Sequence, residues 1–299
     1  DHPNRRSLHQ APVPRTGGLA VFAGILIAAA VTSPNLPLPL WMGCAVVLAV
    51  SFADDVRGVP VLLRLGVHLL AAGAGASALM GEDYGTALVA AAVLGTAWMM
   101  NLFNFMDGSD GLAGGMALIG FTVYGLAAWA AGSTAFALLN FSVAAAAAGF
   151  LVFNFHPARI FLGDVGAVPL GFLAAAFGIA GWLQRDWLWW FPLLVFSPFI
   201  VDASATLARR LLRRERFWEA HRDHYYQRLV QMGWGHRRTA LAAYALMAGC
   251  GAAALFALGL PAAAQAALLF TAGAIYLVLL AAITRAWMAN RTEGRHAID

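Results

Sequence analysis

The sequence predicts an all-α, polytopic transmembrane helix bundle with about ten spans, and three observations carry this prediction. Hydrophobic residues make up 61% of the 299 positions and charged residues only 11%, whereas soluble domains contain about 45–50% and about 25%. The mean hydropathy is +0.71. Apolar runs of about 20 residues, enough to cross a bilayer core, recur along the whole length. Helices are required because an isolated span in lipid must satisfy its own backbone hydrogen bonds.

The individual spans are separated by glycine, proline and charge clusters, which interrupt each apolar run. A polar opening segment, residues 1–16, precedes the first run and contains neither a signal peptide nor a span. The predicted spans, in chain order, are about 17–32, 38–53, 61–80, 86–106, 111–131, 134–155, 165–184, 187–208, 239–260 and 263–285. An even number of spans places both ends of the chain on one side of the membrane.

The basic residues fix the orientation of these spans. All 19 are arginine, and the alternating topology leaves only Arg185 on one side. The positive-inside rule makes the arginine-rich side cytoplasmic. The net charge of +4 then indicates weak attraction to anionic lipid headgroups and no nucleic-acid partner. We therefore predict one integral-membrane domain over residues 1–299, with a cytoplasmic basic loop at 208–238.

Five aspartates are predicted at the cytoplasmic boundary, where charge next to hydrocarbon is costly and marks ion or substrate sites. They come from three separate stretches of chain: Asp54 with Asp55, Asp107 with Asp110, and Asp164. Carboxylates gathered in one bundle repel one another unless a cation compensates, and Mg²⁺ prefers such oxygen ligands. The alternative is that each acid merely ends a helix at the interface.

Two amides precede the second acidic pair. Asn101, Asn104 and Asp107 follow an i, i+3, i+6 spacing, which keeps them along one side of a helix. Gly108 and Gly111 then permit a sharp backbone exit and the close approach of a phosphate. The stripe predicts a polar cavity wall; interhelical hydrogen bonding is the alternative.

The basic segment 208–238 contains His221 and His224, whose imidazoles would point the same way on a helix. The adjacent Arg222 favours binding of an anionic phosphate, and the lack of a cysteine or third histidine close by argues against zinc. A basic helix on the membrane surface is the alternative.

Two further residues have open roles. His156 has a structural role or contacts substrate. Asp202, within a predicted span, pairs with an arginine or belongs to an ion path.

Four motifs, in order and on the expected side, resemble the polyprenyl-phosphate N-acetylhexosamine-1-phosphate transferases. This integral-membrane family includes phospho-N-acetylmuramoyl-pentapeptide transferase, and the similarity covers nearly the whole chain. The motifs are residues 1–9 with 14–18, the Phe-Ala-Asp-Asp of residues 52–55, the Asn-x-x-Asn-x-x-Asp-Gly-x-Asp-Gly-Leu-Ala of residues 101–113, and the Gly-Asp motif that ends residues 153–164.

The resemblance implies a function. Such an enzyme transfers N-acetylhexosamine-1-phosphate from a UDP-sugar to undecaprenyl or another polyprenyl phosphate and releases UMP, at the cytoplasmic face of the bacterial inner membrane. Carried over to this sequence, it implies Mg²⁺, with Mn²⁺ as a substitute, held by Asn104 and Asp164. The other implied residues are Asp54 and Asp55 beside the lipid phosphate, Asp107 and Asp110 at the nucleotide-sugar, and Asn101, Arg64, His221, Arg222 and His224 as substrate-binding groups.

The resemblance also narrows the branch of the family. The His-Arg-x-His pattern of residues 221–224 is similar to the enzymes that initiate O-antigen and capsule synthesis, whereas the muramoyl-pentapeptide enzymes carry adjacent histidines. Family members have one more span before the first cytoplasmic loop, which would make eleven, and a homodimer is a further expectation. The sugar stays open. The alternatives are the muramoyl-pentapeptide reaction, an ion-coupled transporter, and a structural membrane protein.

Overall fold

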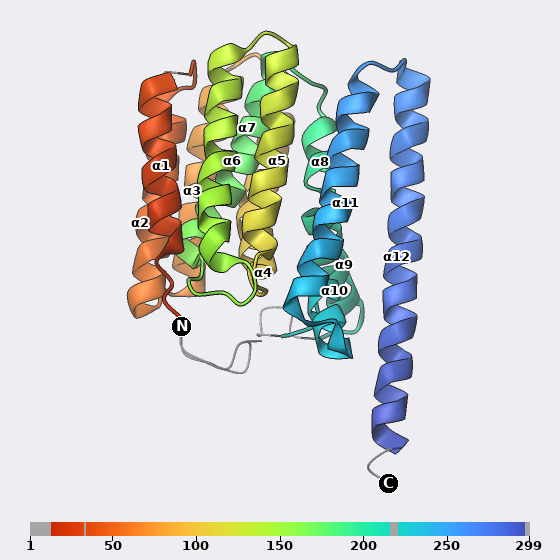
Figure 1. The fold of residues 1–299 in the computed structure, drawn as a ribbon. Helices are drawn as coiled ribbons and strands as arrows, with labels where there is room; N and C mark the ends of the chain where they lie inside the picture. Colours follow the sequence, from red (N-terminus) through yellow and green to blue (C-terminus); the bar gives the residue numbers. More distant parts are fainter. Residues whose placement is uncertain (1–12, 33, 216–220, 297–299) are drawn as a thin grey trace.

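A computed structural model describes residues 13–32, 34–215 and 221–296 of the chain, so residues 1–9 of the first motif lie outside the described residues. The described chain forms an upright bundle of helices, with the start of α1 and the end of α12 at the same end of the bundle (Figure 1). Its elements are α1 (Gly17–Thr32), α2 (Leu38–Arg57), α3 (Val61–Met80), α4 (Thr86–Met106), α5 (Leu112–Ala130), α6 (Thr134–Asn154), α7 (Asp164–Leu183), α8 (Phe191–Val195), α9 (Ser197–Leu212), α10 (Tyr225–Leu229), η1 (Val230–Trp234), α11 (Gly235–Leu258) and α12 (Ala262–His296).

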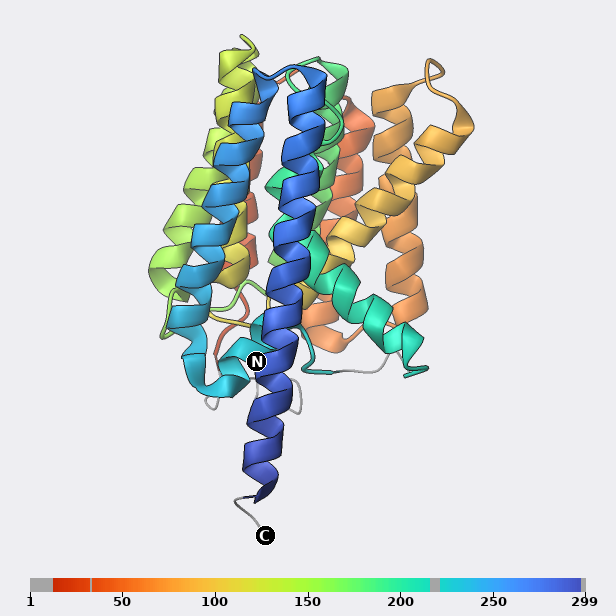
Figure 2. The same ribbon diagram turned by 90° about the vertical axis from the view of Figure 1, so that its right-hand side faces the viewer.

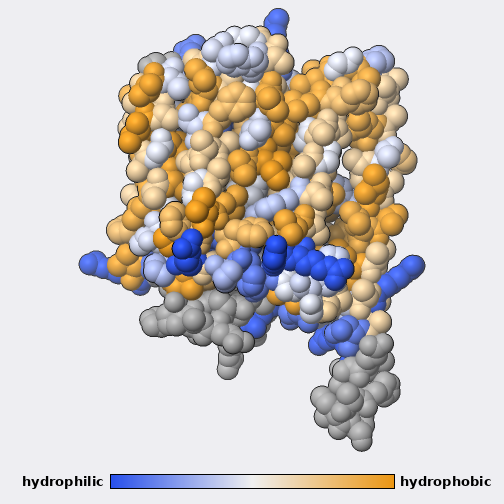
Figure 3. Space-filling view, viewed as in Figure 1, coloured by the Kyte–Doolittle hydropathy of each residue, from blue (hydrophilic) through white to orange (hydrophobic). Residues whose placement is uncertain are grey.

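The helices confirm the predicted all-α, multi-pass membrane fold. Within the described residues, eight helical stretches are long and apolar enough to cross a membrane: α2 to α7, the stretch from α10 to α11, and α12. Helix α1 is also apolar but has only 16 residues. The visible face of the bundle is mostly apolar, and polar residues gather towards its lower end, where the chain termini lie (Figure 3).

The predicted span 187–208 is broken in the structure. Its residues form the short α8 and then α9, which runs on to Leu212 and tilts away from its neighbours (Figure 2). Pro192 and Pro198 each lie in the first turn of their helix. Because proline has no N–H to donate and clashes with the preceding turn, it favours a helix start over a helix interior. A hydropathy pattern records the apolar run but not this break.

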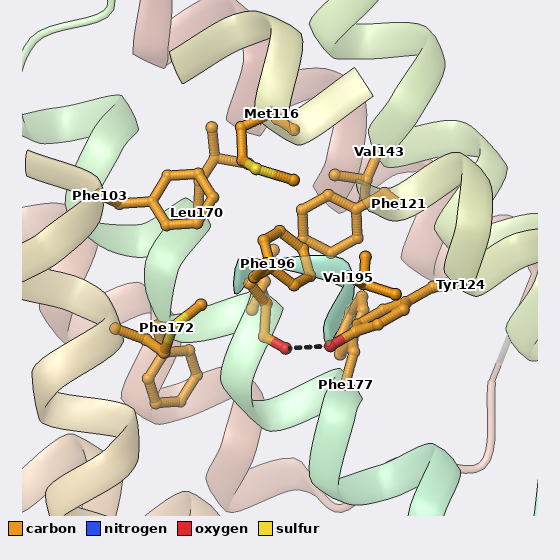
Figure 4. Packing of buried hydrophobic residues seen from close by; sticks show 14 of the residues in the cluster. Phe103, Met116, Phe121, Tyr124, Val143, Leu170, Phe172, Phe177, Val195 and Phe196 are labelled. Carbon is orange, nitrogen blue, oxygen red and sulfur yellow. Dashed lines mark hydrogen bonds between the residues drawn. The ribbon is translucent and has the colours of Figure 1, made fainter. Parts of the chain in front are cut away.

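The core of the bundle is aromatic and surrounds α7. Phe103, Phe121, Phe177 and Phe196 come from separate parts of the chain and meet there, and the Tyr124 hydroxyl donates to the Ala174 carbonyl at 3.1 Å (Figure 4). Buried residues make up 83% of the apolar window of α7 but none of that of α12. The inner helices therefore form the rigid support on which a site at the bundle end depends.

Small residues bring α7 close to α4. A Cβ atom on Gly171 of α7 would lie 2.4 Å from the Met99 carbonyl oxygen of α4. Close helix approach of this kind depends on glycine, alanine or serine at the contact. It sets α4 and α7 side by side, so that the end of α4 and the start of α7 meet at the same boundary.

Helix α12 is attached more loosely. The Trp190 indole donates to Gln265 at 3.2 Å, and the Ser197 and Tyr276 hydroxyls lie 2.7 Å apart. Below these contacts, a cavity of about 940 Å³ separates α12 from α9, α10 and α11. The space-filling view shows the hollow beside α12 (Figure 3).

Candidate active site

Side chains from α2, α3, α4 and α7 meet at one end of the bundle. Arg64 contacts the Asp54 carboxylate, and its Nη1 lies 3.3 Å from Asp164 Oδ2. The Asp54 and Asp164 carboxyl groups also face each other, and the Asn104 side chain lies beside Asp164. The predicted convergence of these residues is therefore present. We call Asp54, Asn104, Asp107 and Asp164 the acid cluster.

Asp55 has a different local role from its neighbour Asp54. Its two carboxylate oxygens accept the backbone N–H groups of Asp164 and Val165, at 3.2 and 2.9 Å. These are among the N–H groups that a helix leaves unpaired in its first turn, so Asp55 caps α7. Arg15 lies 3.6 Å away, and the Asp55 side chain is only 7% exposed. Its contacts describe a residue that holds Asp164 in place.

Gly163 makes this cap geometrically feasible. Its φ of 74° lies in the left-handed region, which favours glycine. A Cβ atom at this position would lie 2.7 Å from Asp55 Oδ2 and 3.0 Å from the Arg15 carbonyl oxygen. The glycine of the Gly-Asp motif is thus required for the approach of α2 to the start of α7.

Asp107 follows the last residue of α4 and completes the acid cluster. The Gly163 N–H donates to it, but burial and the negative charges of Asp164 and Asp55 raise the pKa of its carboxyl group well above the usual range. Like charges packed together disfavour ionisation unless a cation or a hydrogen-bond donor compensates. The acid cluster with Asp55 therefore contains more carboxyl groups than the two neighbouring arginines, Arg15 and Arg64, can neutralise.

The donor chemistry of the acid cluster fits a hard cation. Among the described residues, no group of three or more His, Cys, Asp or Glu side chains is arranged to hold a metal. Mg²⁺ needs fewer protein ligands, because it usually binds one or two carboxylates and completes its octahedron with water and substrate phosphate. Asn104 and Asp164 offer oxygen atoms on adjacent helices, which suits this mode.

The predicted Asn101 has a separate partner. Its side-chain amide donates to the Ala97 carbonyl at 2.7 Å, one turn earlier in the same helix. This contact is the local bonding that amides in membrane helices often make. The role of Asn101 in substrate binding stays a prediction.

Asp110 belongs to a second group of residues in the loop between α4 and α5, residues 107–111. One of its oxygens lies 2.7 Å from His156 Nδ1 and accepts the Ala158 N–H at 3.1 Å. His236 Nδ1 lies 2.9 Å from the Ser109 hydroxyl. Sequence reasoning missed His236 because its only signal was a histidine beside two arginines, about 125 residues after the loop that it contacts.

The glycines of this loop make room for protein side chains. A Cβ atom on Gly108 would lie 2.2 Å from the Tyr226 hydroxyl oxygen, and one on Gly111 would lie 2.8 Å from that of Tyr244. Gly111 also has a φ of 77°. The structure therefore gives these glycines a packing reason, whereas the sequence predicted the approach of a phosphate.

The basic segment 208–238 is more ordered than a loop. Of its described residues, many lie at the end of α9, in α10 and η1, or at the start of α11; residues 216–220 lie outside the described part. His221 and His224 do not share a helix, because residues 221–223 have no helical structure. Their rings are nonetheless close, with centroids 5.0 Å apart.

Asp202 organises this segment. Its two oxygens accept the backbone N–H groups of Tyr225 and Tyr226, at 3.0 and 2.9 Å, and so cap α10. One oxygen also lies 3.1 Å from His224 Nδ1, and His224 is only 3% exposed. The partners of Asp202 are therefore a histidine and a helix start, where the sequence suggested an arginine or an ion path.

His221 and Arg222 lie beside this capped helix. Burial, followed by the nearby His224 and Arg210, lowers the pKa of His221 to about 4. The Arg222 carbonyl accepts from the Gln231 side chain at 2.9 Å. The segment reaches the end of α4 through Tyr226, whose hydroxyl donates to the Phe105 carbonyl at 3.0 Å. The basic residues thus lie on the same end of the bundle as the acid cluster.

Comparisons with known proteins agree with this arrangement. Residues 38–182 match the model of glycosyl transferase family 4. The chain is 28% identical over 261 residues to a probable undecaprenyl-phosphate N-acetylglucosaminyl 1-phosphate transferase of Bacillus subtilis, an alignment that covers 82% of this chain and 73% of the relative. The resemblance predicted from the motifs is borne out. All five aspartates predicted at the cytoplasmic boundary lie within the part that matches the family 4 model.

Two further relatives align with this chain over more residues than the family 4 model matches. A decaprenyl-phosphate N-acetylglucosaminephosphotransferase of Mycobacterium tuberculosis is 29% identical over 293 residues, covering 81% of this chain and 72% of the relative. An undecaprenyl-phosphate alpha-N-acetylglucosaminyl 1-phosphate transferase of Escherichia coli is 26% identical over 319 aligned positions, covering 97% and 85%. These matches support an enzyme and do not favour the transporter alternative.

Proposed function

We propose that this chain transfers an N-acetylhexosamine-1-phosphate from a UDP-sugar to a polyprenyl phosphate and releases UMP. The observation that carries the proposal is the meeting of Asp54, Asn104 and Asp164 with Arg64, from four helices, at one membrane boundary. The arginine-rich side is the cytoplasmic face by the positive-inside rule. The proposed location is the inner membrane of a bacterium, with the site facing the cytoplasm.

The reaction asks the site to bring two polyanions together. A lipid phosphate oxygen attacks the β-phosphorus of the UDP-sugar, and the bond to the UMP oxygen breaks. Mg²⁺, or Mn²⁺ in its place, would supply charge neutralisation on the diphosphate when held by Asn104 and Asp164. Arg64 provides a fixed positive charge at the same point, which stabilises the charge that develops on the leaving phosphate.

Asp54 is suited to orienting the lipid phosphate together with Arg64, which it contacts. A phosphate monoester has a second pKa near 6 and is mostly dianionic at neutral pH, so attack needs little help from a base. General-base action by Asp54 is the alternative role. The pH dependence of kcat separates orientation from general-base action. A base with a pKa above that of the lipid phosphate would add a second fall in kcat on the acidic side of the pH profile.

The surroundings suit the two substrates. Met106 and Leu112 line the apolar cavity beside α12 and also flank the loop of residues 107–111, so a lipid chain near this loop has apolar surface available. On the other side, Arg222 offers a positive charge for the nucleotide phosphates and the neutral His221 ring offers a hydrogen-bonding group, whereas His224 is buried against Asp202. Asp107 and Asp110 belong to the same loop of residues 107–111.

The decisive experiment is an assay of UMP release by the purified protein with UDP-N-acetylglucosamine, undecaprenyl phosphate and Mg²⁺. N-acetylglucosamine is the first choice because the names of the relatives specify it. We expect release to require all three additions and to stop with EDTA. A panel of other UDP-N-acetylhexosamines and UDP-N-acetylmuramoyl-pentapeptide then identifies the sugar.

An aspartate on the opposite side provides the matched control. Asp186 accepts a hydrogen bond from Ser133 near the far end of the bundle, so Asp186→Asn is expected to leave the kinetics unchanged. No UMP release with any UDP-sugar, or release that does not depend on the lipid phosphate, contradicts the proposed function. The homodimer stays a prediction, to be checked by the mass of the purified protein in detergent.

A further inference from the structure

The loop between α4 and α5, residues 107–111, is held from two sides by imidazole rings. On one side stands His236, in the first turn of α11. Its Nδ1 lies 2.9 Å from the Ser109 hydroxyl and accepts the Asp110 backbone N–H at 3.4 Å. A backbone N–H can only donate, so this nitrogen is the acceptor, and a neutral ring then carries its proton on Nε2.

On the other side stands His156, from the segment between α6 and α7. Its Nδ1 lies 2.7 Å from Asp110 Oδ2, which also accepts the Ala158 N–H at 3.1 Å. A carboxylate can only accept, so the Nδ1 of His156 donates. The His156 and His236 rings stack at 5.5 Å with an angle of 12° between their planes. Asp110 is therefore fixed through its main chain by one ring and through its carboxylate by the other.

The position of this loop matters because it begins at the acid cluster. Asp107 lies three residues before Asp110, and two of the residues between Asp107 and Leu112 are glycines. Glycine has the widest backbone freedom, so a loop rich in it needs external contacts to keep one shape. The Asn154 side chain and the Tyr244 hydroxyl provide two such contacts at Gly111. Ser109 and the Asp110 main chain receive theirs from His236.

We infer that His236 is a positioning residue for the proposed phosphotransfer. Through Nδ1 it holds the turn that sets Asp107 in the acid cluster, and it joins this turn to the basic segment that ends in α11. The inference rests on the proposed function. Small displacements of reacting groups cost large factors in rate, so loss of this contact should lower kcat more than it weakens substrate binding.

The experiment compares three substitutions of His236. Asparagine places its side-chain oxygen near the position of Nδ1, glutamine places its amide near Nε2, and alanine removes both. We expect His236→Ala and His236→Gln to lower kcat about 10–100-fold, the range seen when residues that orient ligands are lost. His236→Asn should recover most of the activity, and the KM for the UDP-sugar should change less than threefold throughout.

Two controls keep the result specific. Arg237, exposed in the same helical turn, is replaced by glutamine and should leave kcat and KM unchanged. Ser109→Ala is also combined with His236→Ala. Because each substitution removes the same contact between Ser109 and His236, their effects on kcat should not add. Hydrogen exchange across residues 107–111 should become faster in His236→Ala, with an unchanged thermal unfolding midpoint.

The outcomes are distinguishable from those of the proposed function. If the wild-type protein releases no UMP, the function fails, and the exchange measurement alone then supports or overturns the positioning of the loop. Wild-type kcat in His236→Ala overturns the inference. So does recovery by glutamine with failure of asparagine, which would mean that Nε2 touches substrate. If the unfolding midpoint of each His236 variant falls in parallel with its activity, His236 is a packing residue and the inference is overturned as well.

Discussion

The carboxylate of Asp202 lies at the same end of the bundle as those of Asp54 and Asp164, but its hydrogen-bond partners differ from theirs. Asp202 has both oxygens occupied by the first N–H groups of α10 and lies against His224. Asp54 and Asp164 instead face each other and share Arg64. A carboxylate whose hydrogen bonds are satisfied by the fold maintains the fold. Carboxylates that face one another repel unless a cation or a hydrogen-bond donor compensates; Arg64 supplies one positive charge here, and the magnesium ion stays a proposal.

The largest expected effect tests the acid cluster. Asp164→Asn keeps the size of the side chain but removes a negative charge and the proposed metal ligand. We expect kcat for UMP release to fall by about 10²–10³, the loss typical of removing one electrostatic contact to a transition state. The thermal unfolding midpoint should stay level or rise, since repulsion with Asp54 and Asp107 is relieved. Activity within threefold of wild type would contradict the role given to Asp164.

The opposite pattern is expected at Asp202. Asp202→Ala leaves two backbone N–H groups of α10 and the His224 ring without their acceptor, which costs on the order of 1–3 kcal/mol of stability. The unfolding midpoint should drop, while kcat per folded molecule falls much less than in Asp164→Asn. Loss of activity at an unchanged midpoint would place Asp202 in the chemistry and remove the contrast between the two groups.

Gly163 tests how the fold supports the acid cluster. Gly163→Ala forces a side chain into a left-handed backbone and against the Asp55 carboxylate, at an expected cost on the order of 1–2 kcal/mol. Gly149→Ala is the matched control, because α6 is helical there and a Cβ atom meets nothing within 4 Å. The unfolding midpoint should fall in the first variant and stay level or rise in the second. Equal midpoints would show that the Asp55 cap tolerates a side chain.

The smallest effect concerns pH. His221 has its pKa lowered to about 4 by burial and cationic neighbours, against about 6.5 in an unfolded chain. Between these values the unfolded state binds more protons than the folded state, so stability falls as pH falls from about 6.5 to about 4. His221→Asn should lose less stability over this range than wild type, in parallel thermal unfolding scans. Identical pH profiles would contradict the burial of this ring.

Much of the site could be predicted from the sequence because its signals are local. Asp54, Asp107 and Asp164 each close or open an apolar run, and the spacing of Asn104 to Asp107 follows from helix geometry. Their meeting at one boundary follows from counting spans. The role of Asp55 as a helix cap was not predictable, because it depends on a contact with Asp164 and Val165, about 110 residues away.

By itself the sequence predicted the fold class and the family resemblance, which are borne out, and the side of the membrane on which the acids lie, which stays a prediction. The hydropathy pattern predicts the fold class and the arginine placement predicts the orientation, because the bilayer acts on each span separately. The four motifs predict the family. Only the tertiary structure decided the break between α8 and α9, the partners of Asp202 and the contact of His236 with the loop of residues 107–111. The last two depend on how closely helices approach one another. Residues such as Gly171 and Gly108 permit that approach, but their partners are distant in the chain.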